Sequence, residues 1–203
     1  MIGLTLLLLR KVFILVKRIT PILEDTKKSK SGRYEINDNF LNFWFYYIEK
    51  NRNYIEQDRF NELESFFKEN FNSYVGKKFE KFIILLIKDN LIKEFARFEF
   101  SKIGSQWGNF RREEGKGVYE IDICGVNEKN KAILFGECKW QEKVNALSIL
   151  NEMKEKIKHV HWENEKRKES YAVFAKSFSK KINEFDGKKV YCFDLKDIEN
   201  IIT

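Results

Sequence analysis

The stretch that decides the fold is Tyr119–Gln141, which reads YEIDICGVNEKNKAILFGECKWQ. Two runs rich in β-branched and aromatic residues, VYEIDIC and AILFGECKW, flank the polar segment GVNEKNK. Such runs, joined by so short a connection, predict two neighbouring antiparallel strands. Each predicted strand nevertheless carries charged residues, which a buried strand accepts only when the charges are paired or functional. This hairpin is therefore the first place to look for chemistry.

The charges of the hairpin are expected on defined faces, because side chains along a strand alternate between its two faces. The expected apolar face of the first strand holds Tyr119, Ile121 and Ile123. Glu120 and Asp122 are expected on the opposite face of that strand. The charged face of the second strand holds Ile133, Phe135, Glu137 and Lys139. The pattern thus predicts that Asp122, Glu137 and Lys139 come together near the ends of the two strands, with Glu120 in a supporting position.

Two interpretations of this charged set stay open on the residues alone. In the first, Asp122 and Glu137 supply hard oxygen ligands for Mg²⁺ or Mn²⁺, and the metal activates water for phosphodiester hydrolysis. Lys139 then orients that water or stabilises charge on the phosphate. In the second, the set is an ion-pair ladder on an exposed face, worth only a few tenths of a kcal/mol per pair. The apolar neighbours in both strands favour a covered hairpin and hence the first interpretation.

A family resemblance rests on the same residues. Glu80 in GKKFEKF, Asp122 in YEIDICG, and Glu137 with Lys139 in GECKW resemble the motif of the PD-(D/E)xK nuclease superfamily. The wider context, from KRITPILEDTKKSKSGRYEIND through YVGKKFE to YAVFAKSF, is similar to the C-terminal region of the archaeal ATPase family. In that family a P-loop ATPase is followed by a winged helix and a nuclease-like domain of unknown function. The resemblance covers residues 12–203.

The resemblance implies a fold, an activity and partners. The expected fold is α/β, with a restriction-endonuclease-like core in which helices flank a mixed central sheet. The implied activity is Mg²⁺- or Mn²⁺-dependent hydrolysis of DNA, with Glu80 as a further acid of the metal site. The competing role for Glu80 is a surface acid near a helix N-terminus. A separate P-loop ATPase and a second copy of the chain are the other implied partners.

The expected organisation has two parts. Residues 1–70 are predicted to form a winged-helix remnant and a helical linker, and residues 71–203 the nuclease-like domain. The chain begins inside the segment that corresponds to the winged helix, which indicates a truncated, split or stand-alone relative. The N-terminal part is expected to contain a helix over residues 1–17, strands over Val16–Leu23 and Arg33–Ile36, and an aromatic-rich helix from residue 39 to 55.

The rest of the chain is expected to alternate helices and strands. Two helices broken near residues 72–76 are followed by a strand over 95–104 and an exposed loop over 103–117. After the charged hairpin we expect a long helix over 144–167. Strands over 170–178 and 188–195 and a closing helix complete the predicted order.

Basic and polar residues outside the hairpin are candidates for contact with nucleic acid. They are Lys27, Lys28 and Lys30 in the loop TKKSKSG, and Arg111, Arg112 and Lys116 in the predicted loop before the hairpin. Gln141 is a further candidate, since it follows Glu137 and Lys139 at the strand period. The loop lysines are equally explained as ordinary solvated residues.

Composition limits the classes of function. The 203 residues carry a net charge of +7, but 38 basic residues are interspersed with 31 acidic ones, so polyanion binding is permitted rather than shown. Three cysteines without a CxxC pair favour reduced thiols and a cytoplasmic protein. Arg10 and Lys11 interrupt the apolar N-terminal run well short of the roughly 20 residues that span a bilayer. A non-catalytic module that binds DNA or an ATPase is the alternative to a nuclease, and a decayed fragment is a third possibility.

Overall fold

The computed structural model describes residues 15–112 and 115–202, so most of the helix predicted over residues 1–17 lies outside the described part. The chain divides into two compact units. The first contains the residues up to Thr20 together with Glu24–Asn72, and the second contains Pro21–Leu23 together with Ser73–Thr203. Each unit is described by itself below.

A short hairpin opens the first unit. Strands β1 (Val16–Ile19) and β2 (Arg33–Ile36) pair antiparallel, which confirms the two predicted strands, although the first ends four residues earlier than expected. The connecting loop is held by Arg18, whose guanidinium donates to the carbonyl oxygens of Thr26 and Ser29 at 2.8 and 2.7 Å. The loop residues Lys27, Lys28 and Lys30 are exposed.

Helical turns of three kinds follow in the first unit. They are α2 (Asn39–Phe43), the π-helical turn η1 (Trp44–Ile48), the 3-10 turn η2 (Glu49–Asn51) and α3 (Arg52–Glu56). The Asp38 carboxylate caps α2 by accepting the Leu41 N–H at 2.7 Å. Tyr47 is buried and packs on Phe43 and Phe67, with ring centroids 4.9 Å away in each case. Tyr47, in this aromatic-rich segment, therefore has a packing role.

One long helix replaces the two helices predicted around residues 72–76. Helix α4 runs without interruption over Phe60–Lys88. The expected break was placed at Gly76, but a glycine inside a helix costs only about 1 kcal/mol relative to alanine. Apolar residues beyond it, including Phe79 and Ile83, are buried and outweigh that cost.

The second unit is built on a six-stranded mixed sheet in the order β3-β4-β5-β7-β10-β9. Its strands are β3 (Lys102–Arg112), β4 (Gly115–Asn127), β5 (Ala132–Lys139), β7 (Lys168–Ala175), β9 (Glu184–Phe185) and β10 (Lys188–Phe193). Neighbours β3, β4 and β5 are antiparallel, β5, β7 and β10 are parallel, and β9 is antiparallel to β10. Strands β6 (Val144–Asn145) and β8 (Phe178–Lys180) form a small parallel pair. The prediction of an α/β fold with a mixed central sheet is confirmed.

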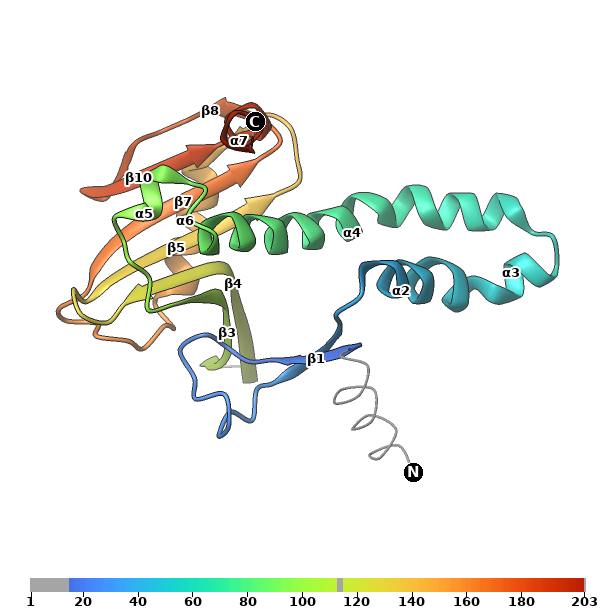
Figure 1. Ribbon diagram of the computed structural model, residues 1–203, viewed down its shortest axis with the longest axis horizontal. Coiled ribbons are helices and arrows are strands. Elements are labelled where there is room, and N and C mark those ends of the chain that lie inside the picture. The colour runs from blue at the N-terminus through green and yellow to red at the C-terminus, as the bar shows by residue number, and fades with distance from the viewer. Residues whose placement is uncertain (1–14, 113–114, 203) are drawn as a thin grey trace. The chain divides into compact units, whose positions relative to one another are not determined.

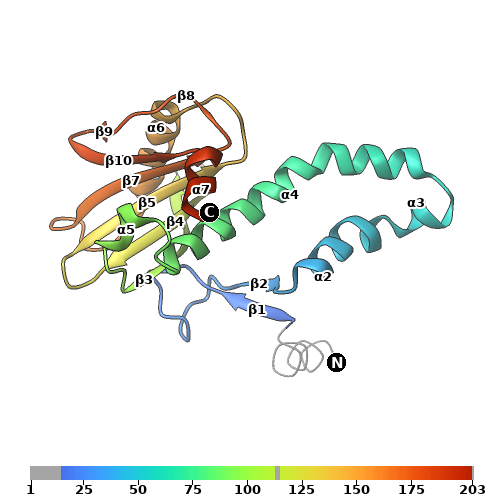
Figure 2. The same ribbon diagram turned by 45° about the horizontal axis from the view of Figure 1, so that its top comes forward.

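Helices cover both faces of this sheet (Figures 1 and 2). Helix α6 (Ala146–Ile157) covers one face, where Leu150 packs among sheet residues such as Phe135. The C-terminal part of α4 covers the other face together with α5 (Lys93–Ala96) and α7 (Leu195–Ile202). There Ile83 and Phe174 belong to one fully buried cluster.

Three predicted elements of the second unit are wrong. Residues 95–104 are not one strand, since α5 ends at Ala96 and β3 begins at Lys102. Residues 103–112 belong to β3 and residues 115–117 begin β4, so the described part of this segment is not a loop, and Trp107 is buried in it. The glycines suggested a loop, yet Gly108 is needed because a Cβ there would lie 2.8 Å from the Tyr119 ring.

The long helix predicted over residues 144–167 is also shorter than expected, because α6 ends at Ile157. The Arg167 guanidinium donates to the carbonyl oxygens of Val160 and Trp162 at 2.9 and 3.2 Å. These bonds satisfy two carbonyl oxygens of the irregular segment that follows α6. In a continuing helix, backbone N–H groups would have bonded to such oxygens.

Candidate active site

A β-bulge interrupts the pairing of β3 with β4, the first strand of the charged hairpin. Gly104 pairs with Cys124 whereas Gln106 pairs with Ile121, so two steps along β3 correspond to three along β4. The extra residue reverses the alternation: Ile121 packs in the cluster beneath α6, and Ile123 packs in the cluster beneath α4. The prediction that these two isoleucines share a face is therefore wrong. Bulges commonly re-aim side chains next to active sites, and Asp122 stands in this one.

Asp122 is held against the neighbouring strand. Its Oδ2 accepts the backbone N–H of Cys138 at 2.9 Å, which joins β4 to β5 beyond their last paired residues. Burial, followed by the negative charge of Glu137, raises the pKa of Asp122 to about 6, against the opposing effects of the Cys138 N–H, Lys139 and Lys156. The structure thus brings Asp122 and Glu137 together.

Glu137 is the most deeply buried acid of the site, with 2% of its side chain exposed. Its Oε2 lies 3.2 Å from the Lys139 Nζ, and its Oε1 lies 2.7 Å from the Lys156 Nζ. Lys139 was expected beside Glu137, because the two share a face of β5. Lys156 comes from α6 and was missed. The sequence feature that could have pointed to Lys156 is its position next to Ile157, a buried residue of α6.

Glu80 reaches the same site from α4. Burial, followed by the negative charges of Asp122 and Glu120 and then Glu137, raises the pKa of Glu80 to about 8, with Lys77 opposing. Glu80 is half-buried rather than an exposed surface acid. Four acids from α4, β4 and β5 therefore influence one another, and two lysines offset part of their charge.

The raised pKa of Glu80 makes the stability of the protein depend on pH. Because the unfolded chain ionises Glu80 near 4.5 and the folded chain near 8, the folded state binds more protons in between, and stability falls as pH rises through that window. We expect Glu80→Gln to remove this loss and to stabilise the protein by roughly 2 kcal/mol at pH 9, with little change at pH 4. Urea titrations at the two pH values measure both effects.

The matched control for this comparison is Glu64→Gln. Glu64 is an exposed acid earlier on α4 that pairs with Lys68. Its removal should leave stability nearly unchanged at both pH values, because exposed ion pairs contribute little. A Glu80→Gln protein whose stability relative to the wild type is the same at pH 4 and pH 9 would contradict the shift.

The other candidate residues lie farther from the acid pair or at its margin. Gln141 is exposed and lies two residues beyond the end of β5 at Lys139. Glu120 is exposed on β4, where its charge acts on Glu80. Arg111 and Lys116 are exposed partners in the β3–β4 ladder. Arg112 ends β3.

The carboxylate oxygens of this site are of the type that a hard divalent cation prefers as ligands. Mg²⁺ is commonly held by one or two carboxylates, with water and substrate phosphate completing the octahedron. Asp122 and Glu137 supply two carboxylates, and burial, followed by the charge of Glu137, raises the pKa of Asp122. Within residues 15–112 and 115–202, however, no three His, Cys, Asp or Glu side chains are gathered as a ready-made metal site.

The histidines and buried cysteines have structural environments. His159 stacks on Phe110 with ring centroids 3.7 Å away, which ties the segment after α6 to β3. Cys124 and Cys138 are buried, as expected for small apolar residues. Burial raises the pKa of the Cys124 thiol to about 12, and burial with the charges of Asp122 and Glu80 raises that of Cys138 well above its usual value. Neither thiol is placed to act as a nucleophile.

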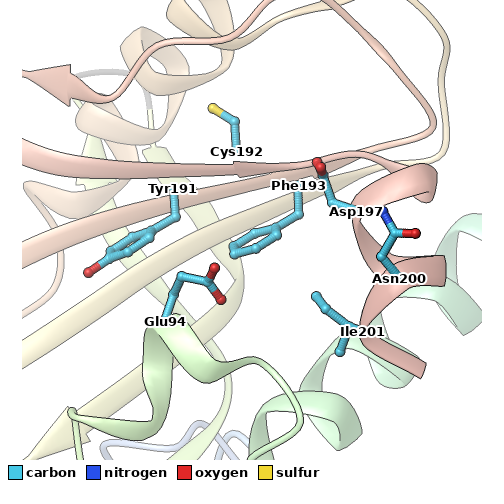
Figure 3. Close-up of a pocket in the computed structure, with 7 residues that line it drawn as sticks. All are labelled: Glu94, Tyr191, Cys192, Phe193, Asp197, Asn200 and Ile201. Carbon is cyan, nitrogen blue, oxygen red and sulfur yellow. The ribbon is translucent and has the colours of Figure 1, made fainter. Parts of the chain in front are cut away.

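A separate hollow of about 450 Å³ lies beside β10. Its lining comes from α5, β10 and α7 and comprises Glu94, Tyr191, Cys192, Phe193, Asp197, Asn200 and Ile201 (Figure 3). Asp197 is occupied there, because it accepts from the Lys181 Nζ at 2.6 Å and from the Asp194 N–H at 2.8 Å. The hollow contains none of the predicted site residues.

Membrane insertion has no support in the helices that the structure describes. None of them combines the length and the apolar character that crossing a bilayer requires.

Comparison with known proteins gives a family and a relative. The family DUF234, described as archaeal and bacterial proteins of unknown function, matches residues 44–173. An uncharacterized protein of Methanocaldococcus jannaschii is 36% identical over 188 residues, which is 90% of this chain and 38% of the relative. The chain therefore spans well under half the length of that relative. No solved structure matches the chain significantly.

Proposed function

The chain belongs to the DUF234 family of archaeal and bacterial proteins of unknown function, and for this member of the family we propose the function of a divalent-metal-dependent nuclease. The observation that carries the proposal is the acid pair of half-buried Asp122 and buried Glu137, with Lys139 paired to the Glu137 carboxylate. Perturbed carboxylates gathered with a lysine at strand ends are typical of catalytic sites. An ordinary ion-pair ladder would leave these groups exposed, whereas Glu137 has 2% of its side chain exposed.

Each residue has a role in this proposal. Asp122 and Glu137 would hold Mg²⁺ or Mn²⁺, which supplies Lewis-acid activation of the phosphodiester and of water. The Cys138 N–H fixes the orientation of Asp122, because it occupies Oδ2. Lys139 presents an ammonium group where negative charge develops on the phosphate. Glu80, with its pKa raised to about 8 by burial and neighbouring acids, carries a proton at neutral pH and adds a neutral donor.

The finer parts of the proposal concern fold and partners. The mixed sheet covered by helices on both faces is compatible with a restriction-endonuclease-like core, and β1 and β2 are compatible with the wing of a winged helix. The proposed substrate is DNA, with exposed Lys27, Lys28 and Lys30 as candidate phosphate contacts. A separate P-loop ATPase and a second copy of the chain are proposed partners.

One observation favours a second candidate, a non-catalytic module that binds DNA or an ATPase. Both oxygens of Glu137 are engaged by lysines, and the described residues hold no assembled three-ligand metal group. A site that has lost its metal would be stable in this arrangement, because the two ammonium groups compensate the buried carboxylate.

The two candidates differ in one assay. The purified chain is incubated with branched, duplex and single-stranded DNA in Mg²⁺ or Mn²⁺, beside Glu137→Ala and Lys139→Ala. For the nuclease we expect cleavage that requires the metal and falls at least about 100-fold in both variants. Lys143→Ala, a change of an exposed lysine beyond the end of β5, should cleave like the wild type. DNA binding without metal-dependent cleavage of any substrate would favour the module instead.

A further inference from the structure

The buried carboxylate of Glu137 forms ion pairs with two lysine ammonium groups. The Glu137 Oε1 lies 2.7 Å from the Lys156 Nζ, and its Oε2 lies 3.2 Å from the Lys139 Nζ. Asp122 is a second acid whose charge interacts with both lysines, but the two ammonium groups occupy both oxygens of Glu137. That arrangement opposes a divalent cation at Glu137, since like charges a few ångströms apart repel.

The two lysines differ in how they are held. Lys139 stands on β5 two residues from Glu137, and both belong to the same strand face. Lys156 belongs to the last turn of α6 and crosses to the sheet only through its side chain, of which 31% is exposed. A lysine on a helix flank can move its ammonium group to water by rotating its stem, while the helix stays in place. Lys156 is therefore the cation that can leave Glu137 without disturbing β5.

We propose that Lys156 is a phosphate-binding residue that occupies Glu137 until a divalent cation takes its place. This inference rests on the proposed nuclease function and names one of its substrate contacts. When the cation takes the Glu137 Oε1, the Lys156 ammonium is freed beside the bound metal. An ammonium is a compact charge with three donors and is well suited to a phosphate oxygen of the substrate. Lys156 thus opposes metal binding in the metal-free protein and favours substrate binding in the metal-bound protein.

This proposal predicts effects of opposite sign from one substitution. In Lys156→Met the cation that competes for Glu137 is gone, so the affinity of the protein for Mn²⁺ alone should rise about 3- to 10-fold. Cleavage of DNA at saturating Mn²⁺ should fall about 10- to 100-fold, because a phosphate contact is lost. Glu137 keeps Lys139 as a partner, so the variant leaves no unpaired buried charge. Calorimetric titration with Mn²⁺ and a cleavage time course give the two values.

Two further variants control the comparison. Lys154→Met removes a lysine from the same helix whose ammonium pairs with Asp186 and not with Glu137, and it should change neither value. Lys156→Arg keeps a cation beside Glu137 and should bind Mn²⁺ like the wild type. A merely structural Lys156 would instead give weaker Mn²⁺ binding and weaker cleavage together.

The possible outcomes separate this inference from the proposed function. A wild-type protein that cleaves DNA, beside a Lys156→Met protein that binds Mn²⁺ no more tightly, overturns the role of Lys156 and leaves the nuclease. Unchanged cleavage by Lys156→Met overturns it as well. A wild-type protein that binds no Mn²⁺ overturns both.

Discussion

Replacing Asp122 with asparagine is expected to make the protein more stable above pH 6 and to reduce its metal-dependent cleavage of DNA about 1,000-fold. The loss of cleavage follows from the loss of one of the two carboxylates proposed to hold the metal. The gain in stability follows from the site itself, because burial and the charge of Glu137 raise the pKa of Asp122 to about 6 from its usual 3.8. Ionised Asp122 therefore costs folding free energy.

The pH window of this gain follows from the same shift. Between about 4 and 6 the folded protein binds more protons than the unfolded chain, so wild-type stability falls as pH rises and stays reduced above that range. Asparagine does not ionise, and its side-chain oxygen can still accept the Cys138 N–H. We expect a gain of about 1–2 kcal/mol at pH 8 and little gain at pH 3.

Urea unfolding at both pH values, together with the cleavage assay, measures this prediction. Glu128→Gln is the matched control, because Glu128 is exposed and pairs only with the exposed Lys102 at the sheet edge in the contacts described. It should change stability by no more than about 0.5 kcal/mol and cleavage not at all. An Asp122→Asn protein that is less stable than the wild type at pH 8 would show that the carboxylate serves the fold and not a function.

Replacing Arg167 with alanine is expected to cause the largest loss of stability. The Arg167 side chain is 7% exposed. Its guanidinium pairs at 2.7 Å with Glu169, whose side chain is 9% exposed. It also donates to the oxygens of Val160, Trp162 and Asn164 at 2.9, 3.2 and 3.0 Å. Alanine removes the donor to the Val160 and Trp162 carbonyl oxygens and one partner of Glu169, which keeps Lys188 and Tyr171. We expect a loss of about 3 kcal/mol, at the lower end of the range for breaking a buried pair.

The shift of the urea midpoint, at an unchanged slope, reports this loss. Arg167→Lys keeps the charge but not the planar fork, so it should recover only part of the stability. Lys131→Ala is the control, since Lys131 is exposed and its bond to Glu163, at 2.9 Å, lies on the surface. It should cost about 0.5 kcal/mol or less. An Arg167→Ala protein as stable as the Lys131→Ala protein would refute the structural role.

The alternation of side chains along the hairpin was sufficient to predict that Asp122, Glu137 and Lys139 meet. It was not sufficient to predict the faces on which the β4 side chains lie. The pairing of Glu137 with Lys139 follows from period two along β5, which is regular. Period two failed on β4 because the bulge opposite Gly104 and Gln106 inserts one residue, and no local pattern announces such an insertion. Asp122 nevertheless reached Glu137, since both stand where their strands cease to pair.

Local sequence patterns could not predict the contact of Lys156 or the β3–β4 hairpin. Lys156 reaches Glu137 through the packing of α6 on the sheet, and a tertiary contact of this kind has no spacing rule. The glycines of residues 103–117 indicated a loop, whereas Gly108 is there to accommodate the ring of Tyr119. The order of helices and strands was predictable, because it depends on apolar periodicity, and the ends of α4 and α6 were not.

The buried cysteines make the reactivity of the protein depend on how often its sheet opens. Cys124 and Cys138 lie on β4 and β5, the two strands that carry the acid pair, and both are shielded from solvent. An oxidant or alkylating reagent reaches a thiol only when the strands around it separate, and only the thiolate reacts. The rate at which these two thiols are modified therefore measures local opening of the strands on which the site is built, with no probe added to the chain.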